Sequence, residues 1–286
     1  MKKLLLCCLA IFINFYNFAQ ANKRIATVDW TVAETLISLG INPVAVGDLK
    51  SYSIWVKEPV INKEYTVDLG NRLQPNLELI SSLNVDLFIN TPMYALISTK
   101  LEKYAPVESV DFTADSNIWD KVVMSTKAVA TYAGETAKGE DMIDLAEQTL
   151  AKLKTSLAGN IKSPIAVIQF ADSKHFRLYA KNSIAGMVLD KLGLPNAYDQ
   201  NGNLWGFVNQ TIDKLADLPA DTILVVVKPY PIDLPAKLKL NSLWNYLPVS
   251  KNLIILDSTW LFGGIPSSLR FANALVNGLQ GESEQW

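Results

Sequence analysis

The chain has 286 residues, and its 26 basic and 28 acidic side chains give a formal net charge of −2. Because the charges form neither a basic stripe nor an acidic tail, nucleic acid and an anionic membrane surface are not expected as partners. With one histidine and two cysteines, the chain is a poor candidate for a zinc or copper site built from the usual nitrogen and sulfur ligands.

The first 21 residues have the pattern of a cleaved signal peptide. Two lysines precede an apolar run over residues 4–18, and residues 19–21 read A-Q-A, an A-x-A cleavage pattern. The apolar run is shorter than the ~20 residues that a bilayer span needs, which makes a membrane anchor the weaker interpretation. Both cysteines would leave with the signal. We therefore expect a mature chain that starts near Asn22, contains no cysteine and resides in the periplasm.

Strand and helix patterns alternate over the first part of the mature chain. A strand, a helix and a second strand in this order imply a parallel pair. The expected elements are a strand over 24–28, a helix over 34–39 that ends at Gly40, a strand over 44–46, a loop-rich stretch over 47–76, a helix over 77–83 capped by Asn76, and a buried strand over 85–90.

A long amphipathic helix is predicted over Thr136–Leu157. Its apolar residues recur at steps of three and four, and acids crowd its start while lysines crowd its end, as the helix dipole favours. At 1.5 Å per residue the helix would be roughly 33 Å long, about the span of a small domain. We interpret it as a connector between two lobes; the alternative is an ordinary surface helix within one large domain.

The second part of the chain repeats the scheme of the first. ETLISLGINPVAV resembles GMVLDKLGLPNAY, and LELISSLNVDLFIN resembles IDKLADLPADTILVVV. The sequence therefore predicts two α/β lobes with mainly parallel sheets, joined by one long helix, with an N-terminal lobe over 22–134, the connecting helix over 135–158 and a C-terminal lobe over 159–286. The expected elements of the second lobe are a strand over 165–170, a helix over 183–192, a helix over 211–218 and strands over 222–227 and 253–256.

Motifs of the common enzyme classes are absent from the sequence. It contains no G-x-G-x-x-G between a strand and a helix, no G-x-x-x-x-G-K-[ST] and no G-x-S-x-G. A Ser-His-Asp triad would have to use His175, which we place in a polar turn. The sequence therefore disfavours an enzyme, and no catalytic residue is predicted.

Aromatic residues and one arginine are expected in loops at strand ends, where open α/β sheets bind their ligands. Trp55, Tyr94, Trp205 and Trp260 have turn-forming or strand-end neighbours, whereas Trp119 and Trp244 are expected in the core. Arg72 lies between a glycine turn and a helix start. Its guanidinium fork suits anionic oxygens, so these loops predict a pocket for a bulky ligand with one electron-rich end.

The segments RIATVDWTVAETLISLGINPVAVGD, YSIWVKEP, VDLGNRLQPNLELI and NLWGF resemble the periplasmic ferric hydroxamate siderophore-binding proteins of the FhuD type. The similarity runs from Arg24 to Leu279. E-T-L-x-x-L-G is shared by all class III periplasmic binding proteins, whereas W-V-x-E-P, G-x-R-x-x-P-N and W-G are more specific to the hydroxamate branch. The resemblance implies two α/β lobes bridged by one long helix.

The resemblance also implies roles for the predicted site residues. Arg72 and Tyr94 would donate hydrogen bonds to the hydroxamate oxygens around Fe(III), and Trp55, Trp205 and Trp260 would line the pocket. The siderophore would chelate the iron fully, so neither protein metal ligands nor a cofactor are expected.

The expected partner is an inner-membrane ABC permease, which members of this family dock through one acidic residue on each lobe. Asp213 matches that position in the C-terminal lobe. In the N-terminal lobe the matching position is Thr99, a departure from the pattern, and Glu102 lies one helical turn further on. A monomer is expected. Two alternatives stay open: a binding protein for a haem, cobalamin or ferric citrate chelate, and an exported hydrolase that uses a serine and His175.

Overall fold

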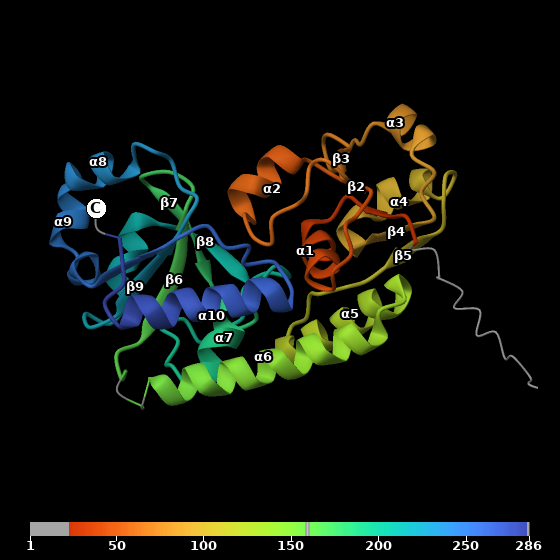
Figure 1. Ribbon diagram of the computed structural model, residues 1–286. Helices are drawn as coiled ribbons and strands as arrows, with labels where there is room; N and C mark the ends of the chain where they lie inside the picture. The colour runs from red at the N-terminus through yellow and green to blue at the C-terminus, as the bar shows by residue number, and fades with distance from the viewer. Residues whose placement is uncertain (1–22, 158, 160, 285) are drawn as a thin grey trace, which may run out of the picture.

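The computed structural model describes residues 23–157, 159, 161–284 and 286, so the predicted signal peptide lies outside the described residues. Two five-stranded sheets form the centres of two lobes, and the long helix α6 (Thr136–Ser156) runs beneath both of them (Figure 1). The predicted fold class of two α/β lobes joined by a long helix is confirmed. No helix in these ranges combines the length and the apolar character that a membrane crossing requires.

The sheet of the N-terminal lobe is entirely parallel, with the strand order β3-β2-β1-β4-β5. Its central strands are buried on both faces, which is why they read as short continuous apolar runs. The elements of this lobe are β1 (Ile25–Thr27), α1 (Trp30–Ser38), β2 (Ala45–Val46), α2 (Leu49–Trp55), β3 (Val67–Asp68), α3 (Leu77–Ser82), β4 (Leu87–Asn90), η1 (Pro92–Tyr94), α4 (Ala95–Leu101), β5 (Val107–Ser109) and α5 (Ile118–Ala133).

The sheet of the C-terminal lobe is mixed, with the order β10-β9-β6-β7-β8. Strands β10, β9 and β6 are parallel, whereas β7 pairs antiparallel with both β6 and β8. The elements are β6 (Ile165–Phe170), β7 (His175–Tyr179), α7 (Ile184–Leu192), β8 (Phe207–Thr211), η2 (Ile212–Asp217), β9 (Ile223–Val227), α8 (Leu234–Lys239), α9 (Ser242–Tyr246), η3 (Pro248–Lys251), β10 (Leu253–Leu256) and α10 (Ile265–Leu279).

Several predicted elements differ from the observed ones, each for a local reason. The first helix begins at Trp30 because Asp29 caps it, accepting hydrogen bonds from two backbone N–H groups. The helix predicted over 211–218 is wrong: Thr211 ends β8, and the turn that follows is the 3₁₀ helix η2. His175 is the first residue of β7 instead of part of a turn. The loop-rich stretch over 47–76 contains α2 and β3.

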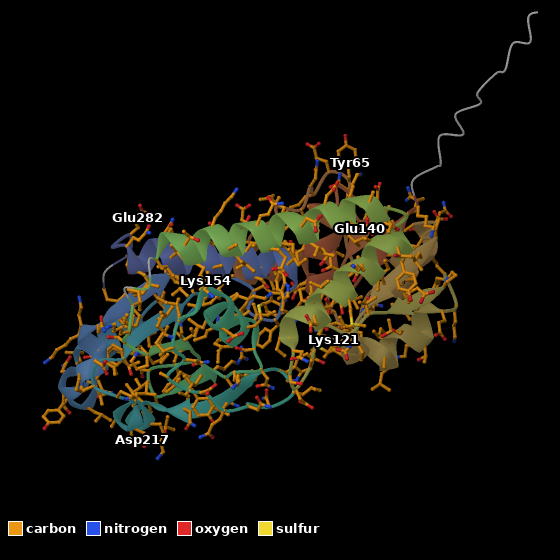
Figure 2. The ribbon with its side chains drawn as sticks, turned by 90° about the horizontal axis from the view of Figure 1, so that it is seen from below. Tyr65, Lys121, Glu140, Lys154, Asp217 and Glu282 are labelled. Atoms are coloured by element: carbon orange, nitrogen blue, oxygen red, sulfur yellow. The ribbon has the colours of Figure 1, made fainter. Side chains whose placement is uncertain are left out.

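The long helix α6 packs against both lobes. Ile143, Ala146 and Leu150 are buried in the hydrophobic core of the C-terminal lobe, and Met142 also packs against the core of the N-terminal lobe. Helix α5 lies against α6 and contributes to both cores as well, so the predicted residue boundaries of the lobes stay predictions. Seen from below, α6 runs beside α10 with its charged side chains on the outer face (Figure 2).

A buried carboxyl group connects the lobes at the start of α10. Glu34 of α1 is fully buried and accepts a hydrogen bond from the Gly264 N–H at 2.7 Å and another from the Ser267 hydroxyl. Gly264 is the N-cap residue of α10 and offers no side chain, so Glu34 caps this helix from the other lobe. A Cβ on Gly263 would lie 2.4 Å from the Glu34 Oε1 atom, so only glycine permits this approach.

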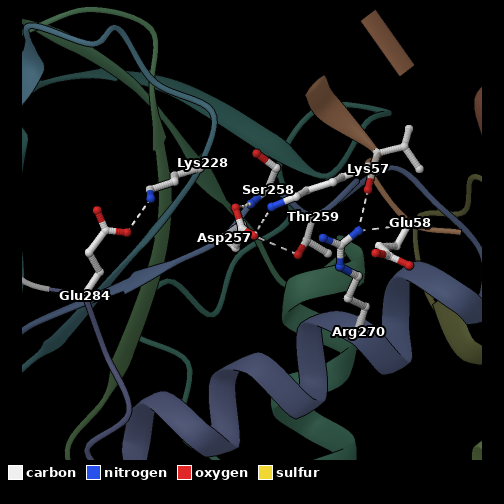
Figure 3. A network of polar contacts seen from close by, with 9 residues as sticks. Lys57, Glu58, Lys228, Asp257, Ser258, Thr259, Arg270 and Glu284 are labelled. Atoms are coloured by element: carbon white, nitrogen blue, oxygen red, sulfur yellow. Dashed lines mark hydrogen bonds and ion pairs between the residues drawn. The ribbon is translucent and has the colours of Figure 1, made fainter. Parts of the chain in front are cut away.

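Two further contacts join the lobes (Figure 3). Lys57, just after α2, forms an ion pair with Asp257, just after β10. Arg270 of α10 donates a hydrogen bond to the Val56 carbonyl oxygen at 2.5 Å. These contacts hold the end of α2 against the C-terminal lobe, on one side of the space between the two sheets.

Candidate ligand-binding site

A cavity of about 490 Å³ lies between the lobes, at the carboxyl ends of β1, β3, β4 and β5. The C-terminal lobe closes it with β7, the turn before β8 and the loop after β10. Parallel strands of an open sheet place their following loops at one edge, which is where ligands of such sheets bind. Its lining residues are Asp29, Thr31, Arg72, Thr91, Pro92, Met93, Tyr94, Asp111, Phe112, Thr113, Arg177, Leu204, Trp205, Phe207, Trp260 and Phe262.

Arg72 reaches the cavity from the turn after β3 and lies on an aromatic surface. Its guanidinium carbon is 3.6 Å from the centroid of the Trp30 ring and 5.9 Å from those of Tyr94 and Trp260. Gly47 makes the approach possible, because a Cβ there would lie 2.9 Å from the Arg72 Cγ atom. The Trp30 indole N–H in turn donates to the Gly47 carbonyl oxygen at 2.8 Å. Stacking therefore fixes the guanidinium plane while its N–H groups stay available to a ligand.

Asp29 lies beside this arginine as a buried acid. One carboxylate oxygen accepts the Thr31 N–H at 2.7 Å and the Val32 N–H at 3.0 Å, and the other accepts the Thr91 hydroxyl at 2.9 Å. Burial raises the pKa of Asp29 above its usual range, although these hydrogen bonds and the charge of Arg72 act in the opposite direction. Asp29 therefore ties α1 to the loop after β4 and lies close to the charge of Arg72.

Tyr94 lines the cavity, and its hydroxyl group is buried. The residue is 1% exposed, and the hydroxyl oxygen is covered and makes no hydrogen bond with any residue that the structure describes. Burial raises the pKa of the phenol, so the group keeps its proton and acts as a donor. A ligand oxygen would reach this proton only after a neighbouring side chain shifted.

The structure brings together four of the five predicted ligand-binding residues. Trp205, in the turn before β8, is 37% exposed at the edge of the cavity, and Trp260, after β10, donates its indole N–H to the Thr31 hydroxyl at 3.2 Å. Arg72 and Tyr94 complete the set. Trp55 does not line the cavity: it ends α2 and packs partly buried against an apolar cluster around α1 and α2. As predicted, Trp119 and Trp244 are buried in the core.

Sequence reasoning missed the cavity residues that lie on strands or directly precede helices. Trp30, the first residue of α1, stacks against Arg72 and was also missed, although its place shortly after β1 could have identified it. Arg177 shares a face of β7 with Tyr179, and the alternation in HFRLY is the signal of that strand. Phe207 and Phe262, whose ring centroids are 5.9 Å apart, were also missed.

The predicted docking residues are exposed in both lobes. Asp213 lies in the first turn of η2, where the hydroxyl of Thr211 holds the pKa of its carboxyl group below the usual range. Glu102 directly follows α4, and Thr99 lies within that helix with its hydroxyl donating to the Leu96 carbonyl oxygen at 3.0 Å. All three side chains face solvent, so none is engaged in the packing of its lobe.

His175 has a structural partner outside the cavity. Its Nδ1 atom lies 2.9 Å from a carboxylate oxygen of Asp172, in the exposed turn before β7. Within the described residues, no group of three or more His, Cys, Asp or Glu side chains is placed to hold a metal ion.

Comparison with known proteins shows which family the sequence is similar to. A family model described as "Periplasmic binding protein" matches residues 25–253. The chain is 25% identical over 263 residues to the Iron(3+)-hydroxamate-binding protein FhuD of Escherichia coli (strain K12), covering 91% of this chain and 88% of that one. It is 26% identical over 251 residues to the Fe(3+)-citrate-binding protein YfmC of Bacillus subtilis (strain 168), covering 86% and 77%.

A solved structure extends the similarity to three dimensions. The siderophore binding protein FhuD from Vibrio cholerae, bound to Fe3+ – Desferal, superposes with a TM-score of 0.85 at 25% identity, covering 92% of this chain and 100% of that one. The resemblance to FhuD-type proteins is thereby confirmed. Because the family model matches most of its length, the chain belongs to the periplasmic binding protein family, whose members are substrate-binding proteins and not enzymes.

Proposed function

We propose that the chain is a periplasmic solute-binding protein that captures an Fe(III)-hydroxamate siderophore of the ferrichrome or ferrioxamine type. The observation that carries the proposal is the Arg72 guanidinium, stacked on Trp30 at the wall of an aromatic cavity between the lobes. A guanidinium fork suits anionic oxygens such as those that surround a chelated ferric ion. The aromatic side chains would contact the carbon framework of the same ligand.

Tyr94 is the second donor of the proposed site. An unpaired buried hydroxyl costs about 1–3 kcal/mol, and a ligand oxygen that pairs with it removes this cost. The shift needed to uncover the hydroxyl would accompany binding. Trp205 and Trp260 would cover the ligand from the C-terminal lobe, and Trp55 would contribute only if α2 moved toward the cavity. The siderophore supplies all iron ligands in this proposal, and no cofactor takes part.

Other iron chelates are the second candidate class, because one relative is named as an Fe(3+)-citrate-binding protein. The lining favours hydroxamates over citrate, because its tryptophan, phenylalanine, leucine and methionine side chains suit the carbon backbone of a large siderophore. The relative that carries Fe3+ – Desferal supports the same choice.

Delivery to an inner-membrane ABC permease completes the proposal. Exposed carboxylates on both lobes, Asp213 and Glu102, would enter basic pockets on the permease, and the protein would act as a monomer. The contacts through Glu34, Lys57 and Arg270 support small movements of the lobes during this cycle, because each joins one lobe to the other on the same side of the cavity.

A competition experiment tests the choice of ligand class. Purified mature protein would be loaded with ferrioxamine, and ferrichrome, ferric citrate, haemin and cobalamin would each be added as competitors. We expect ferrichrome to displace the bound chelate at micromolar concentration or below, and the other three to fail at a hundredfold higher concentration. If ferric citrate, haemin or cobalamin competed better than ferrichrome, the hydroxamate assignment would be wrong.

A further inference from the structure

A second arginine, Arg177, faces the cavity from the C-terminal lobe. It lies in the middle of β7, and its guanidinium carbon is 5.1 Å from the centroid of the Phe207 ring and 5.8 Å from that of Phe262. Its Nη1 atom donates to Gln169 Oε1 at 3.4 Å, and the same oxygen accepts the Tyr179 hydroxyl at 3.1 Å. The rings of Phe207 and Phe262 and the amide of Gln169 thus hold the Arg177 guanidinium at the cavity wall. Most of its N–H donors remain available to a ligand.

No carboxylate balances the charge of Arg177 in the part of the chain that the structure describes. All ion pairs found there within 4.0 Å involve lysine or histidine. Of the two cavity acids, Asp111 pairs with Lys121 at 3.4 Å and Asp29 lies beside Arg72. The cavity therefore holds one guanidinium from each lobe, and among the described residues that of Arg177 has no carboxylate within ion-pair distance.

Resting on the function proposed above, we infer that Arg177 is a specificity-determining residue, which makes the site favour ferric hydroxamates with an anionic pendant group over those with a cationic one. A ferric trihydroxamate core is itself uncharged, so its pendant groups set the net charge of the ligand. Arg72 contacts the core from the N-terminal lobe. Arg177 contacts the same ligand from the opposite side, where the positive charge attracts a carboxylate and repels an ammonium group.

Three ligands with one iron core test this inference. Ferrioxamine B has a pendant ammonium group; its N-acetyl derivative is neutral, and its N-succinyl derivative ends in a carboxylate. Dissociation constants for the three ferric forms would be measured with wild-type protein and with Arg177→Gln. For the wild type we expect the succinyl form to bind about tenfold or more tightly than the ammonium form, which is the size of one charge-assisted hydrogen bond. Arg177→Gln should reduce this ratio to within about twofold of unity, mainly by weakening the succinyl form.

Two comparisons isolate the charge of this side chain. Lys174→Gln removes one positive charge from the exposed turn before β7, outside the cavity, and should leave the ratio unchanged. Arg177→Lys keeps the charge but loses the fork, so most of the preference should remain. In the wild type, raising the salt concentration from 50 mM to 500 mM should shrink the preference, because exposed charges are screened. This last measurement holds even if Arg177→Gln fails to fold.

The possible outcomes separate this inference from the proposed function. If all three ligands bind and the wild type shows no preference, or if Arg177→Gln keeps the preference intact, the role of Arg177 is overturned and siderophore binding stands. If Arg177→Gln weakens the binding of all three ligands equally, the selection by charge is also overturned. If none of the three binds the wild type, the proposed function fails, and the inference fails with it.

Discussion

Replacing Arg72 by alanine is expected to weaken the binding of a ferric hydroxamate by tenfold or more. The guanidinium lies at the cavity wall on the Trp30 ring, and a hydrogen bond from a charged donor is worth roughly 1.5–3 kcal/mol, of which about 1.4 kcal/mol corresponds to a factor of ten. Arg72→Lys should recover only part of the affinity, because an ammonium group offers no fork for two oxygens. Isothermal titration calorimetry with ferrichrome measures both variants.

Arg24→Ala is the matched control for this substitution. Arg24 is exposed near the first of the described residues, where its guanidinium donates to the carbonyl oxygens of Leu83 and Asn84, and it does not line the cavity. Its loss should leave the affinity unchanged. Thermal unfolding of each variant shows whether Arg72→Ala stays folded, since removing the stacked cation also costs up to about 2 kcal/mol of stability. A folded Arg72→Ala protein with wild-type affinity would remove Arg72 from the site.

The protein is expected to lose stability as the pH rises from 5 to 8, because of Glu34. Burial raises the pKa of this carboxyl group from 4.5 to about 8, against the opposing effect of hydrogen bonds from Ser267 and Gly264. Between pH 4.5 and about 8, Glu34 holds a proton in the folded chain that it has released in the unfolded chain. This proton contributes fully to the free energy of unfolding below pH 4.5, and its contribution is lost as the pH rises through 8. Within that window the free energy of unfolding falls by on the order of 1.4 kcal/mol per pH unit.

Glu34→Gln should remove most of this pH dependence. An amide has the same shape, accepts the Gly264 N–H through its oxygen and donates to the Ser267 hydroxyl, yet does not titrate. Thermal unfolding at pH 5, 6, 7 and 8 should give a wild-type curve that falls by several degrees more than the variant curve. Asp29, whose pKa is also raised by burial, contributes in the same direction to both proteins and cancels in the difference. Parallel curves for the two proteins would show that Glu34 is charged in the folded state.

Elements with a strong local pattern could be predicted from the sequence, because their cause is local. The helix over 183–192 has a serine N-cap and ends at Gly193 in the left-handed region, and both signals are visible in the sequence. The strand over 165–170 is an unbroken apolar run. By contrast, β7 and β8 pair with each other although α7 lies between them in the chain, so no hairpin turn marks this pairing in the sequence.

The residues of the candidate site could be predicted only where a polar or aromatic side chain directly follows a predicted strand. Arg72 and Trp260 follow strands and have turn-forming neighbours, which distinguishes them from core residues. Arg177 lies inside a strand, and only the tertiary fold turns its face toward the cavity. Trp55 was expected in a loop because it lies in the loop-rich stretch over 47–76; the helix α2 instead forms between the Asp48 cap and Val56 and places Trp55 in an apolar cluster. Tertiary packing therefore decided the positions that local sequence patterns left open.

The central claim is that the cavity between the lobes binds an intact ferric siderophore, and a fluorescence titration tests it most directly. Tryptophans line the cavity wall and its edge, so a bound ferric chelate should quench their emission. Purified mature protein would be titrated separately with ferrichrome, with iron-free ferrichrome and with free Fe(III) held in solution by a weak chelator. We predict saturable quenching at one equivalent for the ferric siderophore and little change for the other two. Equal quenching by free Fe(III), or no quenching and no thermal shift with any ferric hydroxamate, would contradict the account.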